Sequence, residues 1–176
     1  MANIGYKQTK IGDFLITVPN NFKKTMPFAV VFGGLYNTTG EWMKKRVPEE
    51  LLRMKPFVFA PWETTLESIN NSIPSIKINS VSGYSKGGVR AYPALSIGFN
   101  FVGLIDPSIE GDYNEVVIPP NASFVLAYQN GRTWGASGLN YAAEKLKKIN
   151  PNNVLAVNVG HSEFPEYFFK TFGSRL

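Results

Sequence analysis

Short apolar runs alternate with helix-like stretches along the whole of this chain of 176 residues. Residues 28–32 (FAVVF) and 101–105 (FVGLI) are unbroken apolar runs, which is typical of strands buried on both faces of a parallel sheet. Residues 39–54 and 138–149 have the spacing of helices, although Pro48 breaks the first. The alternation predicts an α/β fold with a doubly wound, mostly parallel sheet flanked by helices. The predicted strands are 6–10 and 13–18 (a hairpin), 28–32, 57–60, 76–82, 101–105, 123–128 and 154–159, and the predicted helices are 39–54, 86–97, 138–149 and 163–172.

Length and composition predict a single domain over residues 1–176. A typical domain has about 100–200 residues, and the sequence shows no internal repeat, low-complexity tract or obvious linker. No apolar run approaches the roughly 18 residues that cross a bilayer, and the first residues lack the pattern of a secretory signal. The sequence has no cysteine, so it can form neither a disulfide nor a thiolate metal site. We therefore expect a soluble, cytoplasmic protein without a membrane span.

The basic charge balance changes this picture little. The formal net charge is +5 and the sequence pI is about 9.4. However, the lysines and arginines are scattered, and residues 44–46 and 147–148 form the short clusters among them. Such a distribution is typical of solvated helix faces, so we expect no specific nucleic-acid site.

Residues 81–88 (VSGYSKGG) contain a G-x-S-x-G motif where a predicted strand gives way to a predicted helix. Such a turn lifts the serine hydroxyl clear of the sheet edge, and its tightness requires small residues two positions to either side. Ser85 is therefore the candidate nucleophile. The segment has two other interpretations, a glycine-rich turn without chemistry and a phosphate-binding loop. The second is weak because the spacing departs from G-x-x-x-x-G-K-[ST].

The chain has one histidine, His161, which follows the last predicted strand directly after Gly160. Open α/β sheets place their sites at the carboxyl ends of the strands. A serine hydroxyl needs a base to accept its proton, so His161 is the candidate general base. Metal binding is not expected, because no second histidine and no cysteine is present to share the ligation.

A carboxylate is expected to orient the histidine and to stabilise its charged form. In chain order it should lie between the serine and the histidine. Asp106 ends the strand that follows the nucleophile helix and is the first candidate. Asp112 and Glu110 are the alternatives, and the Asp-Pro pair could also be a simple turn. Asn130 could orient a histidine but could not neutralise it.

These residues resemble the α/β-hydrolase superfamily over nearly the whole chain. The motifs that carry the resemblance are GYSKG at 83–87, FGG at 32–34 and GH at 160–161. The resemblance implies a mostly parallel sheet, a Ser–acid–His triad and an oxyanion hole, here in a small member without a cap domain. Most members place the acid after the next strand, where this chain has Gln129 and Asn130. The GLIDP segment at 103–107 looks like the pancreatic-type lipases, which place their acid one strand earlier.

The resemblance also implies which groups surround the reacting carbonyl. The oxyanion hole would use the backbone N–H of Lys86 together with that of Gly34 or Leu35. Several aromatic residues fall in predicted loops near the carboxyl ends of the strands. They could form an apolar wall for an acyl, aryl or sugar group. These residues are Tyr36, Trp62, Tyr84, Trp134 and Phe164.

The sequence thus predicts an esterase- or lipase-like serine hydrolase that acts on a small-molecule or polymer-borne ester and uses no cofactor. An amidase or peptidase would use the same residues. The alternative from another class is a catalytically silent hydrolase fold that serves as a binding or structural subunit of a larger assembly such as a virion. The two classes differ in whether Ser85, His161 and a carboxylate converge within hydrogen-bonding reach.

Overall fold

In the computed structural model, which describes residues 4–35 and 39–176, eight strands form one sheet in the order β1-β2-β4-β3-β5-β6-β7-β8. Strand β1 pairs antiparallel with β2, and β2 pairs antiparallel with β4. All other pairings, along the order β4-β3-β5-β6-β7-β8, are parallel. The strands are β1 (Tyr6–Ile11), β2 (Phe14–Pro19), β3 (Phe28–Phe32), β4 (Phe57–Ala60), β5 (Ile78–Tyr84), β6 (Phe101–Ile105), β7 (Phe124–Gln129) and β8 (Val154–Val157).

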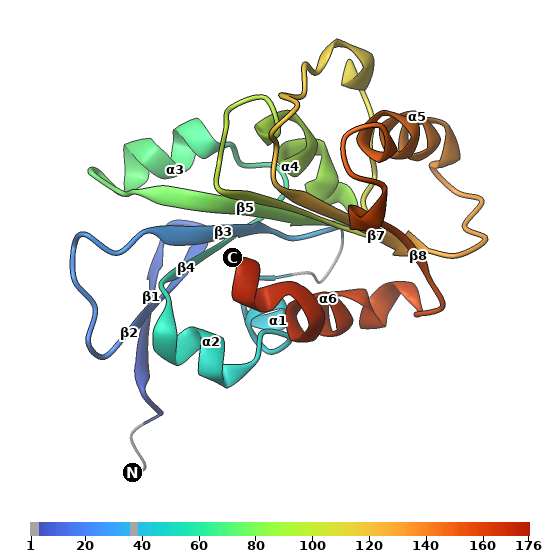
Figure 1. Ribbon diagram of the computed structural model, residues 1–176. Helices are drawn as coiled ribbons and strands as arrows, with labels where there is room; N and C mark the ends of the chain where they lie inside the picture. The colour runs from blue at the N-terminus through green and yellow to red at the C-terminus, as the bar shows by residue number, and fades with distance from the viewer. Residues whose placement is uncertain (1–3, 36–38) are drawn as a thin grey trace.

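Helices cover both faces of this sheet. Figure 1 shows α3, α4 and α5 on one face and α1, α2 and α6 on the other. The α-helices are α1 (Gly40–Lys44), α2 (Glu49–Met54), α3 (Leu66–Ser72), α4 (Gly88–Ala94), α5 (Ala136–Lys147) and α6 (Phe164–Phe172). Short 3₁₀ turns lie at Ser85–Gly87, Tyr113–Glu115, Pro151–Asn153, His161–Glu163 and Gly173–Arg175.

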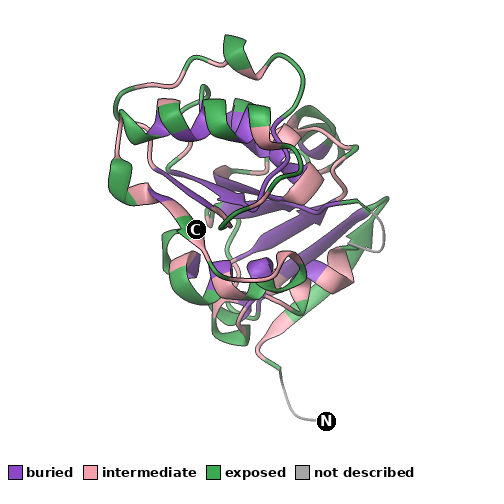
Figure 2. Ribbon diagram, turned by 90° about the vertical axis from the view of Figure 1, so that its right-hand side faces the viewer, coloured by how far each residue is buried: buried purple, intermediate pink, exposed green. Residues whose placement is uncertain are grey.

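The two faces have separate hydrophobic cores, which explains the unbroken apolar runs in the sequence. Successive side chains of a strand point to opposite faces. In β3, Val30 therefore packs in the core beneath α4 and α5, whereas Val31 packs in the core of α1, α2 and α6. Figure 2 shows the central strands of the sheet buried and the helices exposing their outer sides. The predicted doubly wound α/β fold is confirmed.

The predicted elements agree with the structure except at some ends and for one helix. Pro48 separates α1 from α2, as the sequence indicates. Strand β5 continues to Tyr84 because it pairs with β6 up to Ile105. Strand β8 ends at Val157, two residues early, because its partner β7 ends there. The helix that sequence patterning missed, α3, has only seven residues.

Parallel strands bring their carboxyl ends to the same edge of the sheet. The segments that follow β3, β5, β6, β7 and β8 therefore meet there, although long stretches of sequence separate them. This edge is where open α/β sheets bind their ligands. Over the two described ranges, every helix is too short or too polar to cross a bilayer.

Candidate active site

The turn after β5 holds Ser85 in a conformation that few residues adopt. The φ angle of Ser85 is +51°, in the left-handed region that is costly for a residue with a side chain. A Cβ on Gly83 would lie 2.2 Å from the carbonyl oxygen of Gly87. A Cβ on Gly87 would lie 2.4 Å from the carbonyl oxygen of Phe32. Both glycines of the motif are thus required by the tightness of the turn.

His161 connects the serine to a carboxylate. Its Nε2 lies 3.1 Å from Ser85 Oγ, and its Nδ1 lies 2.6 Å from Asp106 Oδ2. A carboxylate accepts hydrogen bonds, so in the neutral ring Nδ1 carries the hydrogen and donates a hydrogen bond to Asp106. Nε2 is then the acceptor for the Ser85 hydroxyl. The series of hydrogen bonds is therefore continuous from Ser85 Oγ through His161 to the buried carboxylate of Asp106.

Asp106 is fully buried at the end of β6 and has a φ of +39°. Its second oxygen, Oδ1, accepts hydrogen bonds from the Gln129 N–H at 2.9 Å and from Arg132 Nη1 at 2.8 Å. Burial would raise the pKa of Asp106. The hydrogen bonds from His161 and Gln129 and the charge of Arg132 outweigh burial and hold the pKa below its ordinary value. Asp106 is therefore a carboxylate at neutral pH.

Arg132 is a component of this site that sequence reasoning missed. Its side chain is as fully buried as that of Asp106, and Nη2 donates to the carbonyl of Pro107 at 2.7 Å. The guanidinium also lies 3.8 Å from the centre of the Trp134 ring. Burial lowers the pKa of Arg132, and Asp106 opposes that shift. An arginine remains protonated in proteins, so the pair is a buried ion pair.

Two aromatic rings enclose the imidazole of His161. The Tyr84 ring stacks on the imidazole with 4.9 Å between the ring centres, and the Trp134 ring packs edge-on with the same distance of 4.9 Å between centres. The Tyr84 hydroxyl donates to the backbone carbonyl of His161 at 2.9 Å. Burial, with a further contribution from the charge of Asp106, raises the pKa of Tyr84 to about 12. Packing and hydrogen bonding therefore fix the position of the imidazole ring.

The structure separates the candidate acids. Asp106 is the one that hydrogen-bonds His161. Glu110 forms an ion pair with Lys86, and Asp112 lines a different cavity. Asn130 donates to the side chain of Asn158 at 3.2 Å. The geometry thus favours the Asp-Pro position at the end of β6 over the alternatives.

Ser85 opens into a cavity of about 470 Å³, where Tyr84 and Trp134 of the predicted aromatic wall lie. Trp62 lies instead against Lys86, whose Nζ is 5.3 Å from the ring centre. The prediction for Phe164 was wrong, because this side chain starts α6 and is fully buried in the core. Tyr36 lies outside the described residues. The cavity is lined by Leu35, Tyr84, Ser85, Lys86, Ser108, Glu110, Trp134 and His161.

The segments predicted to form the oxyanion hole lie beside the serine. Lys86 is in the first turn of the 3₁₀ segment Ser85–Gly87, where backbone N–H groups have no partner within the helix. A Cβ on Gly34 would come within 2.9 Å of the Ser85 Cβ, so the turn after β3 passes directly against the turn that carries Ser85. Leu35 lines the cavity. The use of these N–H groups as oxyanion donors stays a prediction.

The same region offers no evident metal centre. Among residues 4–35 and 39–176, no group of three or more histidine or acidic side chains is arranged to hold a metal ion. The polar groups around Ser85 are instead one imidazole, one carboxylate and one guanidinium. They suit proton transfer and the stabilisation of charge.

No family model and no curated protein matches the sequence, but solved structures match it over nearly its whole length. The siderophore hydrolase EstB from Aspergillus nidulans has a TM-score of 0.55 at 12% identity, and the match covers 100% of this chain and 96% of that one. Esterase B from Lactobacillus rhamnosis, solved with a tributyrin phosphonate inhibitor, has a TM-score of 0.55 at 13% identity, with coverage of 97% and 85%. The fluorophosphonate-binding serine hydrolase FphF from Staphylococcus aureus has a TM-score of 0.54 at 8% identity, with coverage of 97% and 96%. The chain therefore has the α/β-hydrolase fold.

Proposed function

We propose that this protein is a serine hydrolase that cleaves carboxylic esters through an acyl-enzyme on Ser85. The observation that carries the proposal is the continuous hydrogen-bonded chain from Ser85 Oγ through His161 to the buried carboxylate of Asp106. The nucleophile also stands on a strained turn at the carboxyl edge of the sheet. The similar structures named above, two of them an esterase and a serine hydrolase, agree with this chemistry.

In the first half of the reaction, Ser85 Oγ attacks the carbonyl carbon of the ester. The hydroxyl proton passes to His161 Nε2 while the new C–O bond forms, and the carbonyl electron pair moves onto the oxygen. Asp106 stabilises the imidazolium that results. When the tetrahedral intermediate collapses, the bond to the alcohol breaks and the alcohol takes the proton from Nε2. The acyl group remains on Ser85.

In the second half, a water molecule takes the place of the alcohol. His161 Nε2 accepts a proton from this water as it attacks the acyl carbon, and then returns the proton to Ser85 Oγ as the acid is released. The oxyanion of both intermediates would be bound by the N–H of Lys86 and that of Gly34 or Leu35. Loss of one such donor typically raises the barrier by about 3–4 kcal/mol. These steps need no cofactor.

The convergence of the three side chains is also what favours an enzyme over a silent binding or structural subunit. A scaffold would gain nothing from placing a buried ion pair and a strained serine around a lone histidine. An amide substrate would pass through the same steps, so esters and anilides with the same acyl group should be compared directly. We expect the ester to be cleaved faster.

Covalent labelling tests the proposal. A fluorophosphonate probe should label the folded wild-type protein, and Ser85→Ala and His161→Ala should abolish labelling. Ser72→Ala is the matched control, because Ser72 is an exposed serine at the end of α3 and should leave labelling unchanged. A folded wild type that neither reacts with the probe nor hydrolyses an activated acetyl ester would refute the proposal.

A further inference from the structure

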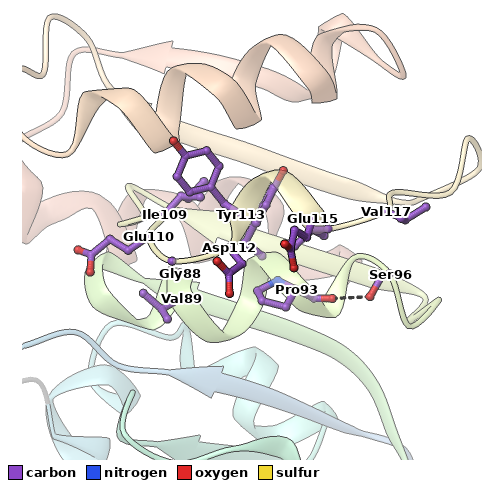
Figure 3. A pocket seen from close by; sticks show the side chains of 13 residues that line it. Gly88, Val89, Pro93, Ser96, Ile109, Glu110, Asp112, Tyr113, Glu115 and Val117 are labelled. Atoms are coloured by element: carbon purple, nitrogen blue, oxygen red, sulfur yellow. Dashed lines mark hydrogen bonds between the residues drawn. The ribbon is translucent and has the colours of Figure 1, made fainter.

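A second cavity, of about 550 Å³, lies between α4 and the segment that follows β6. Figure 3 shows Val89 and Pro93 on the helix and Asp112 and Glu115 reaching from the segment toward it, whereas the ring of Tyr113 is turned the other way, against Tyr141 of α5. Glu110 stands at one end of the cavity, and Ser96 and Val117 stand at the other. It is lined by Gly88, Val89, Tyr92, Pro93, Ser96, Ile109, Glu110, Gly111, Asp112, Tyr113, Glu115, Val116 and Val117.

The walls of this cavity define the chemistry of its occupant. Most of the lining side chains are aliphatic or aromatic, which suits an apolar group. The charged side chains that line it are all acidic, namely Glu110, Asp112 and Glu115. An anionic group would meet like charges there, which are unfavourable at close range. The cavity is therefore suited to an uncharged apolar chain.

This cavity and the one that contains Ser85 share a lining residue. Glu110 lines both cavities, and its carboxylate is paired with Lys86, the residue after the nucleophile. The first lining residue of α4, Gly88, is only three positions beyond Ser85. From Gly88 to Ala94 the helix advances about 9 Å at 1.5 Å per residue, and Ser96 lies two residues beyond its end. The lining of the cavity thus starts three residues beyond the nucleophile and follows the helix away from it.

The position of His161 decides which part of an ester would enter. The departing alcohol must reach His161 Nε2 to take its proton, so it lies on the side of His161 and Trp134. The carbonyl oxygen would face Lys86 and the turn after β3. The remaining substituent of the carbonyl carbon is the acyl chain, and it is left to extend past Glu110.

We propose that the cavity between α4 and residues 109–117, here named the acyl cavity, binds the uncharged acyl chain of the ester substrate. The inference rests on the proposed function and extends it to a substrate class, esters of medium-length, neutral acyl groups. Each further methylene that becomes buried strengthens binding roughly fourfold. The specificity constant should therefore rise with acyl length until the cavity is filled.

Narrowing the cavity at two depths tests this assignment. The substrates are 4-nitrophenyl esters with acetyl, butyryl, octanoyl and dodecanoyl groups. Val89→Trp narrows the cavity near Ser85 and should lower the octanoyl-to-acetyl ratio of kcat/KM at least tenfold. Ser96→Trp narrows its far end and should lower the dodecanoyl-to-octanoyl ratio, with a smaller effect on octanoyl over acetyl. The two variants obstruct the cavity at different depths, so each should limit the acyl chain to a different length.

Met54→Trp is the matched control. Met54 lies beside a separate apolar cavity near the amino ends of β3 and β4, so an added tryptophan there should leave the chain-length ratios at wild-type values. Fluorophosphonate labelling of each variant reports whether the turn that carries Ser85 is intact. If Val89→Trp is not labelled, the test relies on Ser96→Trp. Labelled variants that keep wild-type ratios would overturn the acyl cavity and leave the serine hydrolase standing. An unreactive wild type would instead overturn the proposed function.

Discussion

The two sides of Ser85 are built in opposite ways. Toward β7 and β8, the side chains of Asp106 and Arg132 are fully buried and joined to their neighbours by directed hydrogen bonds. Toward α4, the acyl cavity has mostly apolar walls, and Val117 at its far end is 75% exposed. The side toward β7 and β8 is formed by residues at and near the ends of paired strands, which the sheet holds in place. The side toward α4 is formed partly by the long connection between β6 and β7. In the proposed enzyme, reactivity and substrate preference would therefore be carried by separate parts of the chain.

This difference predicts different responses to substitution. A hydrogen bond to a buried charge is lost as a whole when one partner is removed, and the remaining partner is left without compensation. Apolar contacts scale with buried area, so their loss is graded. We therefore expect large, length-independent effects on the β7 side and smaller, length-dependent effects on the α4 side.

The largest effect is expected for Asp106→Asn. The amide would hold His161 in the wrong tautomer and would not stabilise its charged form, so kcat should fall by about 10⁴-fold. The loss should be equal for acetyl and octanoyl esters, because the acyl cavity is untouched. Asp13→Asn, in the exposed turn between β1 and β2, is the control and should keep wild-type kcat. A loss of less than tenfold would show that Asp106 is not the acid of the reaction.

Arg132→Met should have the next largest effect, on stability. Removing the guanidinium leaves the buried carboxylate of Asp106 without its cation, which typically costs about 3–5 kcal/mol of unfolding free energy. Urea unfolding at pH 7 measures the change. Lys170→Met removes an exposed partner of Glu166 and should change stability little, because such surface pairs contribute little. Equal urea midpoints for both variants would contradict the structural role of Arg132.

The smallest effect is expected for Tyr84→Phe. At pH 8 the variant loses the hydrogen bond to the His161 carbonyl, a change of about 1 kcal/mol. The pKa of Tyr84 is raised to about 12 in the fold, above the value of about 10 in an unfolded chain. Its neutral form thus stabilises the fold, fully below pH 10 and progressively less as the pH rises toward 12.

The variant should accordingly lose less stability than the wild type between pH 9 and pH 11, as measured by chemical unfolding. Tyr92, whose pKa is also raised to about 12 by burial, is present in both proteins and cancels from the comparison. If the wild type and the variant lose the same unfolding free energy between pH 9 and pH 11, Tyr84 does not contribute to this pH dependence.

The sequence was sufficient for those parts of the molecule that local patterns determine. Unbroken apolar runs revealed the buried strands, the G-x-S-x-G spacing revealed Ser85, and the absence of a second histidine left only His161. Asp106 followed from chain order and from its place at a strand end. Geometry was needed to choose it over Asp112 and Asn130, because only the sheet shows which group reaches the imidazole.

The remaining features depend on strand pairing and packing, which no local pattern contains. Arg132 reaches Asp106 because β7 pairs beside β6, with Ile105 opposite Ala127. Phe164 was expected near the site because it follows the last strand, but the amphipathic face of α6 turns it into the core. The pairing of Glu110 with Lys86, which borders both cavities, likewise joins two segments that are distant in sequence.

The left-handed backbone at Ser85 and Asp106 has an evolutionary consequence. Each residue occupies a region of φ that costs a side-chain-bearing residue about 1–2 kcal/mol relative to its ordinary conformation. Glycine would relieve this cost at either position and would abolish the hydroxyl or the carboxylate. Selection for thermal tolerance alone would therefore favour glycine at position 85. At position 106 it would not, because loss of the carboxylate would leave the buried guanidinium of Arg132 unpaired, at a cost of about 3–5 kcal/mol. If the proposed reaction is correct, lineages that lose it should show glycine at position 85 early, and lineages that retain it should not.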